Sequence, residues 1–154
     1  MLDLPCWRIA IAGACAMAIA SVGAPAQGSI EFRNAFDDSP LDVRAKPGEI
    51  LTDAVKTFHA TGRNLYAGDG KVLAEGKQLY LSWCQGCHLP DGTGRIGPSL
   101  VGDSFTYDRV SSDVGMFEVI YGGAAGAMQP FSKRISQDQM LKIIAYVRSL
   151  KKKD

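Results

Sequence analysis

Apolar residues recur every three or four positions in four stretches of the chain, with polar residues between them. The stretches cover residues 50–58, 73–83, 113–121 and 136–150. Spacing of this kind places the apolar side chains along one face of an α-helix, which can then pack against other helices. The pattern therefore predicts an all-α fold.

The last stretch carries its own signals for where the helix begins. Ser136 is suited to cap the amino end, and Gln139 three residues later completes a capping box. Ile135 and Met140 flank this turn and can form a hydrophobic staple. We therefore interpret Met140 as a core residue. The preceding helix is expected to end at the glycine pair 122–123, because glycine commonly terminates helices.

The composition is that of a globular protein of about one domain. Of the 154 residues, 46% are hydrophobic and 21% are charged, and the formal net charge is +1. A chain this apolar is not intrinsically disordered, and a charge this balanced is not typical of a protein that binds phosphates of nucleic acid. We expect a folded domain with no nucleic-acid partner.

Residues 1–26 have the features of a secretory signal peptide. A positively charged start is followed by apolar residues 9–22 and by the small-x-small site Ala24-Pro25-Ala26. Cleavage before Gln27 would release the chain into the periplasm with no stable membrane insertion. The alternatives are an uncleaved anchor, for which the apolar run is short of about 20 residues, and acylation of Cys15, past which the apolar run continues.

Cys84-Gln85-Gly86-Cys87-His88 is the C-x-x-C-H motif of covalent haem attachment. Two thiols at this spacing can bond to both vinyl groups on one porphyrin edge, and His88 then lies under the iron as proximal ligand. The alternatives are a disulfide, a thioredoxin-like redox pair or half a zinc site. A redox pair belongs at a strand-to-helix turn, and a structural zinc site needs four ligands. The sequence around the motif offers neither context. The motif therefore predicts one covalently bound haem c, attached through Cys84 and Cys87.

A long loop is expected directly after the motif. Residues 89–112 are rich in glycine and lack a helical pattern, and a loop of this length in a compact chain is usually functional. It can wrap the porphyrin edge. The pair Gly97-Pro98 offers carbonyl groups that can accept a hydrogen bond from the second imidazole nitrogen of His88. The alternative is that the pair forms an ordinary turn.

The second iron ligand has four candidates, Met116, Met128, Met140 and His59. Met128 lies in a loop of small residues, 122–130, that can bring a thioether close to a flat ring. Met116 lies on an apolar helix stripe that is typical of the core, and His59 is expected to be solvated at a helix end. Met128 is the predicted ligand, with an open or water-bound iron as the alternative. Methionine paired with histidine raises the reduction potential and favours electron transfer.

Residues 27–72 are expected to pack on the haem domain at 73–154 rather than to form a linker. Besides the amphipathic run ending at Phe58, they supply enough apolar surface for such packing, contributed by Phe32, Phe36, Leu41, Val43, Leu65 and Tyr66. The sequence therefore predicts one haem domain with an amino-terminal extension.

These residues resemble the cytochrome c-L family, the electron acceptors of pyrroloquinoline quinone (PQQ)-dependent methanol dehydrogenases in methylotrophic bacteria. The general class I cytochrome c pattern covers 73–150 and is shared by many electron carriers. More specific are segments 115–130 and 139–148, together with 36–42 and 61–66, which generic small cytochromes lack. The resemblance implies a class I-like cytochrome c domain with the extension packed on it.

The resemblance also implies roles for individual residues. By it, Cys84 and Cys87 attach the haem, His88 and Met128 ligate the iron, and the Pro98 carbonyl accepts a hydrogen bond from His88. These roles agree with those suggested by the motif and its loops.

One departure from the family lies in the long loop. Phe105 stands where a tryptophan is common, so an indole contact to a haem propionate would be missing. Tyr107 and Arg95 are both candidates to replace it.

The function implied by the resemblance is electron transport rather than enzyme catalysis. The chain would accept single electrons from a PQQ-dependent methanol dehydrogenase and pass them to a smaller c-type cytochrome. One alternative is a generic periplasmic cytochrome serving another quinoprotein alcohol dehydrogenase. Another is a haem enzyme or sensor with an open distal site, but peroxide chemistry needs distal acid–base residues and the only histidine besides His88 is His59.

Overall fold

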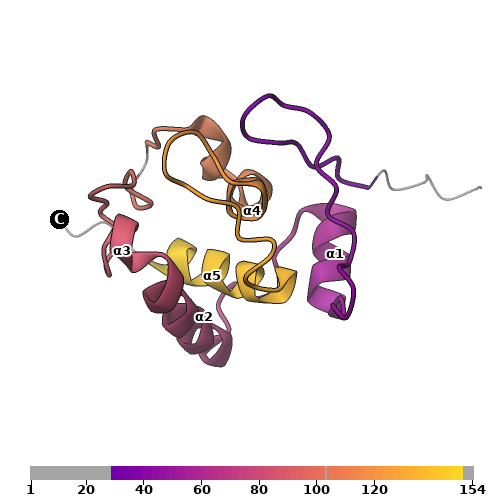
Figure 1. Cartoon of the computed structure of the whole chain (residues 1–154). Coiled ribbons are helices and arrows are strands. Elements are labelled where there is room, and N and C mark those ends of the chain that lie inside the picture. Colours follow the sequence, from indigo (N-terminus) through magenta and orange to yellow (C-terminus); the bar gives the residue numbers. More distant parts are fainter. Residues whose placement is uncertain (1–28, 103, 151–154) are drawn as a thin grey trace, which may run out of the picture.

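The computed structural model describes residues 29–102 and 104–150, so the expected signal peptide at 1–26 lies outside the described residues. The helices are α1 (Asp53–Thr61), α2 (Gly70–Trp83), α3 (Gln85–His88), the 3-10 helix η1 (Asp108–Ser111), α4 (Asp113–Gly122) and α5 (Gln137–Ser149) (Figure 1). Within the described ranges there is no strand, and an isolated bridge joins Arg33 to Pro40. The predicted all-α fold is confirmed. None of the helices in these ranges has the length and apolar character needed to cross a membrane.

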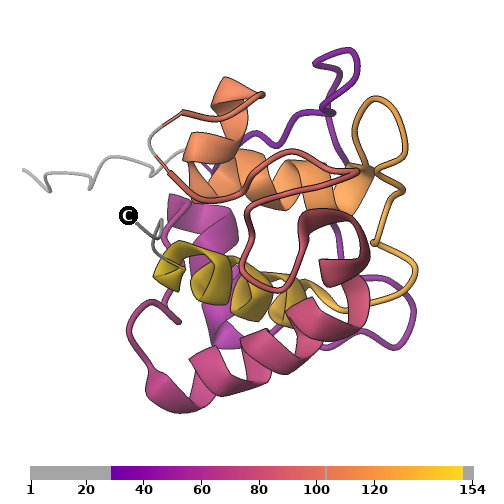
Figure 2. The same cartoon turned by 90° about the vertical axis from the view of Figure 1, so that its left-hand side faces the viewer.

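Helix α5 lies at the centre of the fold and contacts α1, α2 and α4, most extensively α2, which runs along the lower edge of the view in Figure 2. A side chain at Gly76 would collide with the backbone of Lys142, so glycine allows the two helices to approach closely. The rings of Tyr80 and Tyr146 meet across this contact, with centroids 5.4 Å apart. The apolar stripe of α5 is buried as expected, with Met140 fully inside the core.

The predicted helix ends are largely confirmed. The Ser136 hydroxyl accepts a hydrogen bond from the Gln139 backbone, and the Gln139 side chain accepts one from the Ser136 backbone, which completes the capping box. Helix α4 ends at Gly122, followed by Gly123 at φ +82°. Helix α2 begins earlier than predicted, at Gly70, because the Asp69 carboxylate caps its first turn.

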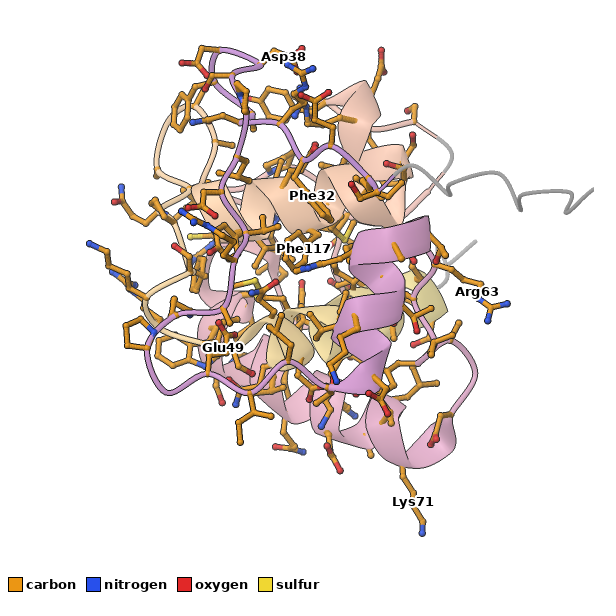
Figure 3. All side chains as sticks on the ribbon, turned by 90° about the vertical axis from the view of Figure 1, so that its right-hand side faces the viewer. Phe32, Asp38, Glu49, Arg63, Lys71 and Phe117 are labelled. Atoms are coloured by element: carbon orange, nitrogen blue, oxygen red, sulfur yellow. The ribbon has the colours of Figure 1, made fainter. Side chains whose placement is uncertain are left out.

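The amino-terminal extension packs on the helices through aromatic side chains. Phe32 and Phe58 both lie against Phe117 of α4, with ring centroids 5.3 and 5.2 Å apart (Figure 3). The expectation that His59 is solvated is wrong. Its Nε2 lies 2.7 Å from Oε1 of the buried Gln137, and its ring meets Phe32 edge-on at 5.3 Å. The extension folds over this histidine, which no local sequence pattern indicates.

Polar groups at the amino end of α5 also hold the extension. The Gln137 side chain donates to the Val43 carbonyl at 2.9 Å, and its backbone N–H donates to the Glu49 carboxylate at 2.8 Å. Thr52 donates to Asp138 at 2.8 Å. The extension is therefore attached to α5, the central helix of the fold.

Candidate functional site

A cavity of about 670 Å³ is bounded by α2, α3, α4, α5 and the loops between them. Its size falls within the range of roughly 300–1,000 Å³ that is typical of ligand and cofactor pockets. Its wall is mainly apolar and includes Leu100, Val110, Ile120, Ile143 and Val147. The five residues that the sequence singles out all line this cavity, namely Cys84, Cys87, His88, Pro98 and Met128.

Cys84 and Cys87 lie where α2 gives way to the single turn of α3. The Cys84 N–H donates to the carbonyl of Tyr80 at 2.8 Å, and the Cys87 N–H donates to the Cys84 carbonyl at 3.1 Å. Both thiols are free and partly buried. Burial, with a smaller contribution from Cys87, raises the pKa of Cys84 to about 12. A thiol that stays protonated in this way is unlike the activated thiolate of a thioredoxin-like pair.

The imidazole of His88 is buried and held in one orientation. Its Nδ1 lies 2.9 Å from the carbonyl oxygen of Pro98. A carbonyl only accepts hydrogen bonds, so Nδ1 carries the proton and donates, and the lone pair of Nε2 is left for a metal. Gly97 packs so closely against the ring that a β-carbon at this position would lie 2.5 Å from Cε1.

The glycine-rich loop folds back onto the cysteine motif through its backbone. The N–H of Gly94 donates to the carbonyl of His88 at 3.0 Å. The N–H groups of Arg95 and Gly97 both donate to the carbonyl of Cys87, at 3.1 and 3.0 Å. These bonds bring the Gly97-Pro98 pair beside the histidine ring.

The candidate second ligands occupy different places. Met128 is half-buried in the loop after α4, where its carbonyl accepts from the Ala124 N–H at 3.0 Å. Met116 of α4 belongs to the core, as expected, and also reaches the cavity wall. Met140 is enclosed in the core, and His59, on α1 of the extension, contacts Phe32 and Gln137. The helical stripe of Met116 predicted a core position, so its place on the cavity wall is an addition made by the structure.

Tyr107 and Arg95, the two candidates for a propionate contact, both line the cavity. Phe105 instead packs against the core cluster. Arg95 is also held near the motif, since its guanidinium donates to the Gly86 carbonyl at 3.2 Å.

The cavity wall also includes two aromatic side chains and an arginine that sequence analysis did not identify as site residues. The guanidinium of Arg134 lies over the ring of Phe131 at 5.6 Å, and that ring meets Trp83 edge-on at 6.2 Å. Trp83 directly precedes the first cysteine, but Phe131 and Arg134 come from a distant loop. Their position depends on the tertiary fold, so no local motif could have revealed it.

The donor set fits a covalently held haem. One largely apolar cavity is lined by two thiols, by an imidazole whose Nε2 is available and by a thioether. Across the described ranges, no group of three or more His, Cys, Asp or Glu side chains could hold a metal ion. A structural zinc site, which needs four such ligands, is therefore not formed by these residues.

Comparison with known proteins identifies the family. Residues 71–147 match the model described as cytochrome C oxidase, cbb3-type, subunit III. The chain is 38% identical over 143 residues to cytochrome c-L of Methylorubrum extorquens, and the match covers 92% of this chain and 73% of that relative. The chain belongs to the cytochrome c-L family. The family assignment made from the sequence is confirmed.

Solved cytochrome c-L structures share its fold. The protein from the marine methylotrophic bacterium Methylophaga aminisulfidivorans is 38% identical with a TM-score of 0.75, over 78% of this chain and 80% of that chain. The protein from Hyphomicrobium denitrificans is 39% identical with a TM-score of 0.77, over 82% of this chain and 77% of that chain. The cytochrome c-L fold is thus confirmed, and membership makes this chain a c-type cytochrome, an electron carrier with covalently attached haem c.

Proposed function

We propose that this chain is a periplasmic electron carrier of methylotrophic metabolism. It accepts single electrons from a PQQ-dependent methanol dehydrogenase and passes them to a smaller c-type cytochrome. It carries one haem, attached through Cys84 and Cys87, with His88 and Met128 as iron ligands. The sequence at 1–26 supports export. No substrate bond is made or broken.

The observation that carries the proposal is the shared cavity of the motif histidine and a methionine. The bound haem supplies reversible one-electron chemistry. The Pro98 carbonyl, 2.9 Å from Nδ1, fixes the orientation of the His88 ring. Met128 reaches the same cavity from the loop after α4, so its thioether would be the second ligand to the haem iron and would leave no site on the iron for a substrate.

The rim of the cavity suits a short-lived encounter with a redox partner. Ala125, Gly126 and Ala127 are exposed, and their small side chains allow close approach to the cavity. Such encounters typically bury less than roughly 1,200 Å² in total. With a net charge of +1, steering by the overall charge is weak, and any salt dependence comes from local patches.

Stopped-flow spectroscopy tests the donor. The mature haem-bound protein is mixed with purified methanol dehydrogenase and methanol, and haem reduction is followed at several protein concentrations. We expect saturable reduction. Reduction by another quinoprotein alcohol dehydrogenase, with none by any methanol dehydrogenase, would instead favour a generic carrier.

Mass spectrometry of the periplasmic protein tests maturation. We expect a chain that begins near Gln27 and carries one haem through two thioether bonds. A periplasmic chain with a free thiol pair and no haem would refute the proposed cofactor.

A further inference from the structure

Leu89, the residue that follows the haem histidine, has an unfavourable backbone conformation. Its φ is +61° and its ψ is 159°, a region that residues with a β-carbon rarely adopt. This conformation ends α3 directly after His88. Strained residues of this kind persist only where their surroundings hold them, and they cluster at functional sites.

The hydroxyl of Tyr80 is one of the groups that hold this turn. It donates to the Leu89 carbonyl at 2.7 Å and lies 3.4 Å from the His88 carbonyl. The same Leu89 carbonyl accepts from the Gly92 N–H at 3.2 Å. Tyr80 is fully buried on α2, and its ring is fixed against Tyr146 of α5. The turn is therefore attached to the contact between α2 and α5.

The turn determines where the following loop goes. From Leu89 the loop returns to the motif, where the Gly94 N–H donates to the His88 carbonyl at 3.0 Å. The return ends with the Pro98 carbonyl 2.9 Å from His88 Nδ1. The placement of that carbonyl thus depends on the direction of the chain at Leu89.

We propose that Tyr80 is a positioning residue for the haem ligand. Its hydroxyl holds the Leu89 turn and, through that turn, keeps the Pro98 carbonyl against His88. This inference rests on the proposed function, in which His88 ligates the iron. A hydrogen bond from Nδ1 makes an imidazole ligand more basic, which favours ferric over ferrous iron and lowers the reduction potential. Weakening that bond should raise the potential.

The first experiment compares Tyr80→Phe with Tyr146→Phe in the full haem-bound protein. We expect Tyr80→Phe to raise the reduction potential in a redox titration while the absorption band of methionine ligation is kept. Tyr146→Phe removes a hydroxyl from the ring packed on Tyr80, whereas the hydroxyl bonded to the His88 and Leu89 carbonyls is that of Tyr80. Tyr146→Phe should leave the potential unchanged. Equal potentials in Tyr80→Phe and the wild type would overturn the inference.

The second experiment relieves the backbone strain at Leu89. The Tyr80 hydroxyl is proposed to hold that strained turn in place. Glycine adopts the Leu89 conformation freely, so a Leu89→Gly chain should depend less on Tyr80. We expect the potential shift caused by Tyr80→Phe to be much smaller in the Leu89→Gly background. A shift of the same size in both backgrounds would overturn the link through Leu89.

Three further outcomes each support or overturn the inference. If Tyr80→Phe alone fails to accumulate, the inference requires that adding Leu89→Gly restores the haem-bound protein, and failure to restore it would overturn the inference. A wild-type chain without haem would overturn the proposed function and this inference with it. A normal wild-type chain with an unshifted Tyr80→Phe variant would overturn this inference alone.

Discussion

The α-carbon of Gly97 packs against the face of the His88 imidazole, where a β-carbon would lie 2.5 Å from Cε1 and 2.8 Å from Nε2. Gly97→Ala must therefore move either the ring or the loop. Overpacking of this kind typically costs about 1–3 kcal/mol. We expect a lower free energy of unfolding in urea for the haem-bound protein and a lower yield of attached haem.

Gly86→Ala is the matched control for this change. Gly86 lies between the two cysteines, and nothing lies within 4 Å of a β-carbon added there. Its stability and haem content should stay near those of the wild type. Equal behaviour of the two alanine variants would show that the ring does not need the space at Gly97.

Met128→Ala should remove the thioether proposed as the second ligand to the haem iron. The near-infrared band of methionine bound to ferric haem should disappear, the reduction potential should fall, and cyanide should bind several-fold more tightly. Absorption spectroscopy and redox titration measure these changes. The haem should stay attached, because Cys84 and Cys87 are unchanged.

Met116 provides the critical control for Met128, since it also reaches the cavity. Met116→Leu and Met140→Leu conserve volume, so they should keep the band and cost less than about 1.5 kcal/mol each. Loss of the band in Met116→Leu alone would move the ligand assignment from Met128 to Met116.

The free energy of unfolding should fall in acid because Asp138 and Glu49 become protonated. These two carboxylates join the extension to α5. Burial acts to raise the pKa of Asp138, but hydrogen bonds from Tyr66, Thr52 and Lys142 outweigh it and lower the pKa from the ordinary 3.8. For Glu49, burial is similarly outweighed, chiefly by the Gln137 N–H, and the pKa lies below 4.5. Lowered pKa values mean that the unfolded chain binds more protons, so this stability is present above the ordinary values and lost as pH falls through the lowered ones.

Urea unfolding across an acid pH series measures this effect. Asp138→Asn should reduce the dependence of stability on pH in that range, because the amide does not titrate. Asp53→Asn removes an exposed carboxylate on α1 and should keep a dependence close to that of the wild type. Identical pH dependence in the wild type and Asp138→Asn would exclude Asp138 as a source of the acid sensitivity.

Ala125→Glu should slow reduction by methanol dehydrogenase several-fold while the haem spectrum and potential stay near those of the wild type. Ala125 is exposed on the cavity rim, so a bulky charge there obstructs close approach of a partner. Stopped-flow rates measure the effect. Ala74→Glu adds the same charge to an exposed position of α2 and should leave the rate unchanged. An unaltered rate in Ala125→Glu would place the docking surface elsewhere.

The parts of the fold that sequence could predict are those with local causes. The Ser136 capping box and the apolar stripe of α5 depend on residues a few positions apart, and both were predictable. The same holds for the C-x-x-C-H motif. Covalent haem chemistry requires its residues to be adjacent, so the motif can be recognised without the fold.

Contacts between distant segments could not be predicted in this way. His59 looked like a solvated helix end because its partner, Gln137, is far away in the sequence. Met116 looked like an ordinary core residue because its helix stripe explains it fully, although it also reaches the cavity. Side chains of this kind acquire their surroundings only when distant segments meet.

The bonds that hold the extension have a consequence for the order of folding. Thr52 and Asp138 are separated by 86 positions, and Val43 and Gln137 by 94. The hydrogen bond between His88 and Pro98 spans only 10 positions. Short loops close at a lower entropic cost than long ones. The histidine can therefore acquire its immediate surroundings early, whereas the extension is held only after the distant helix α5 has formed.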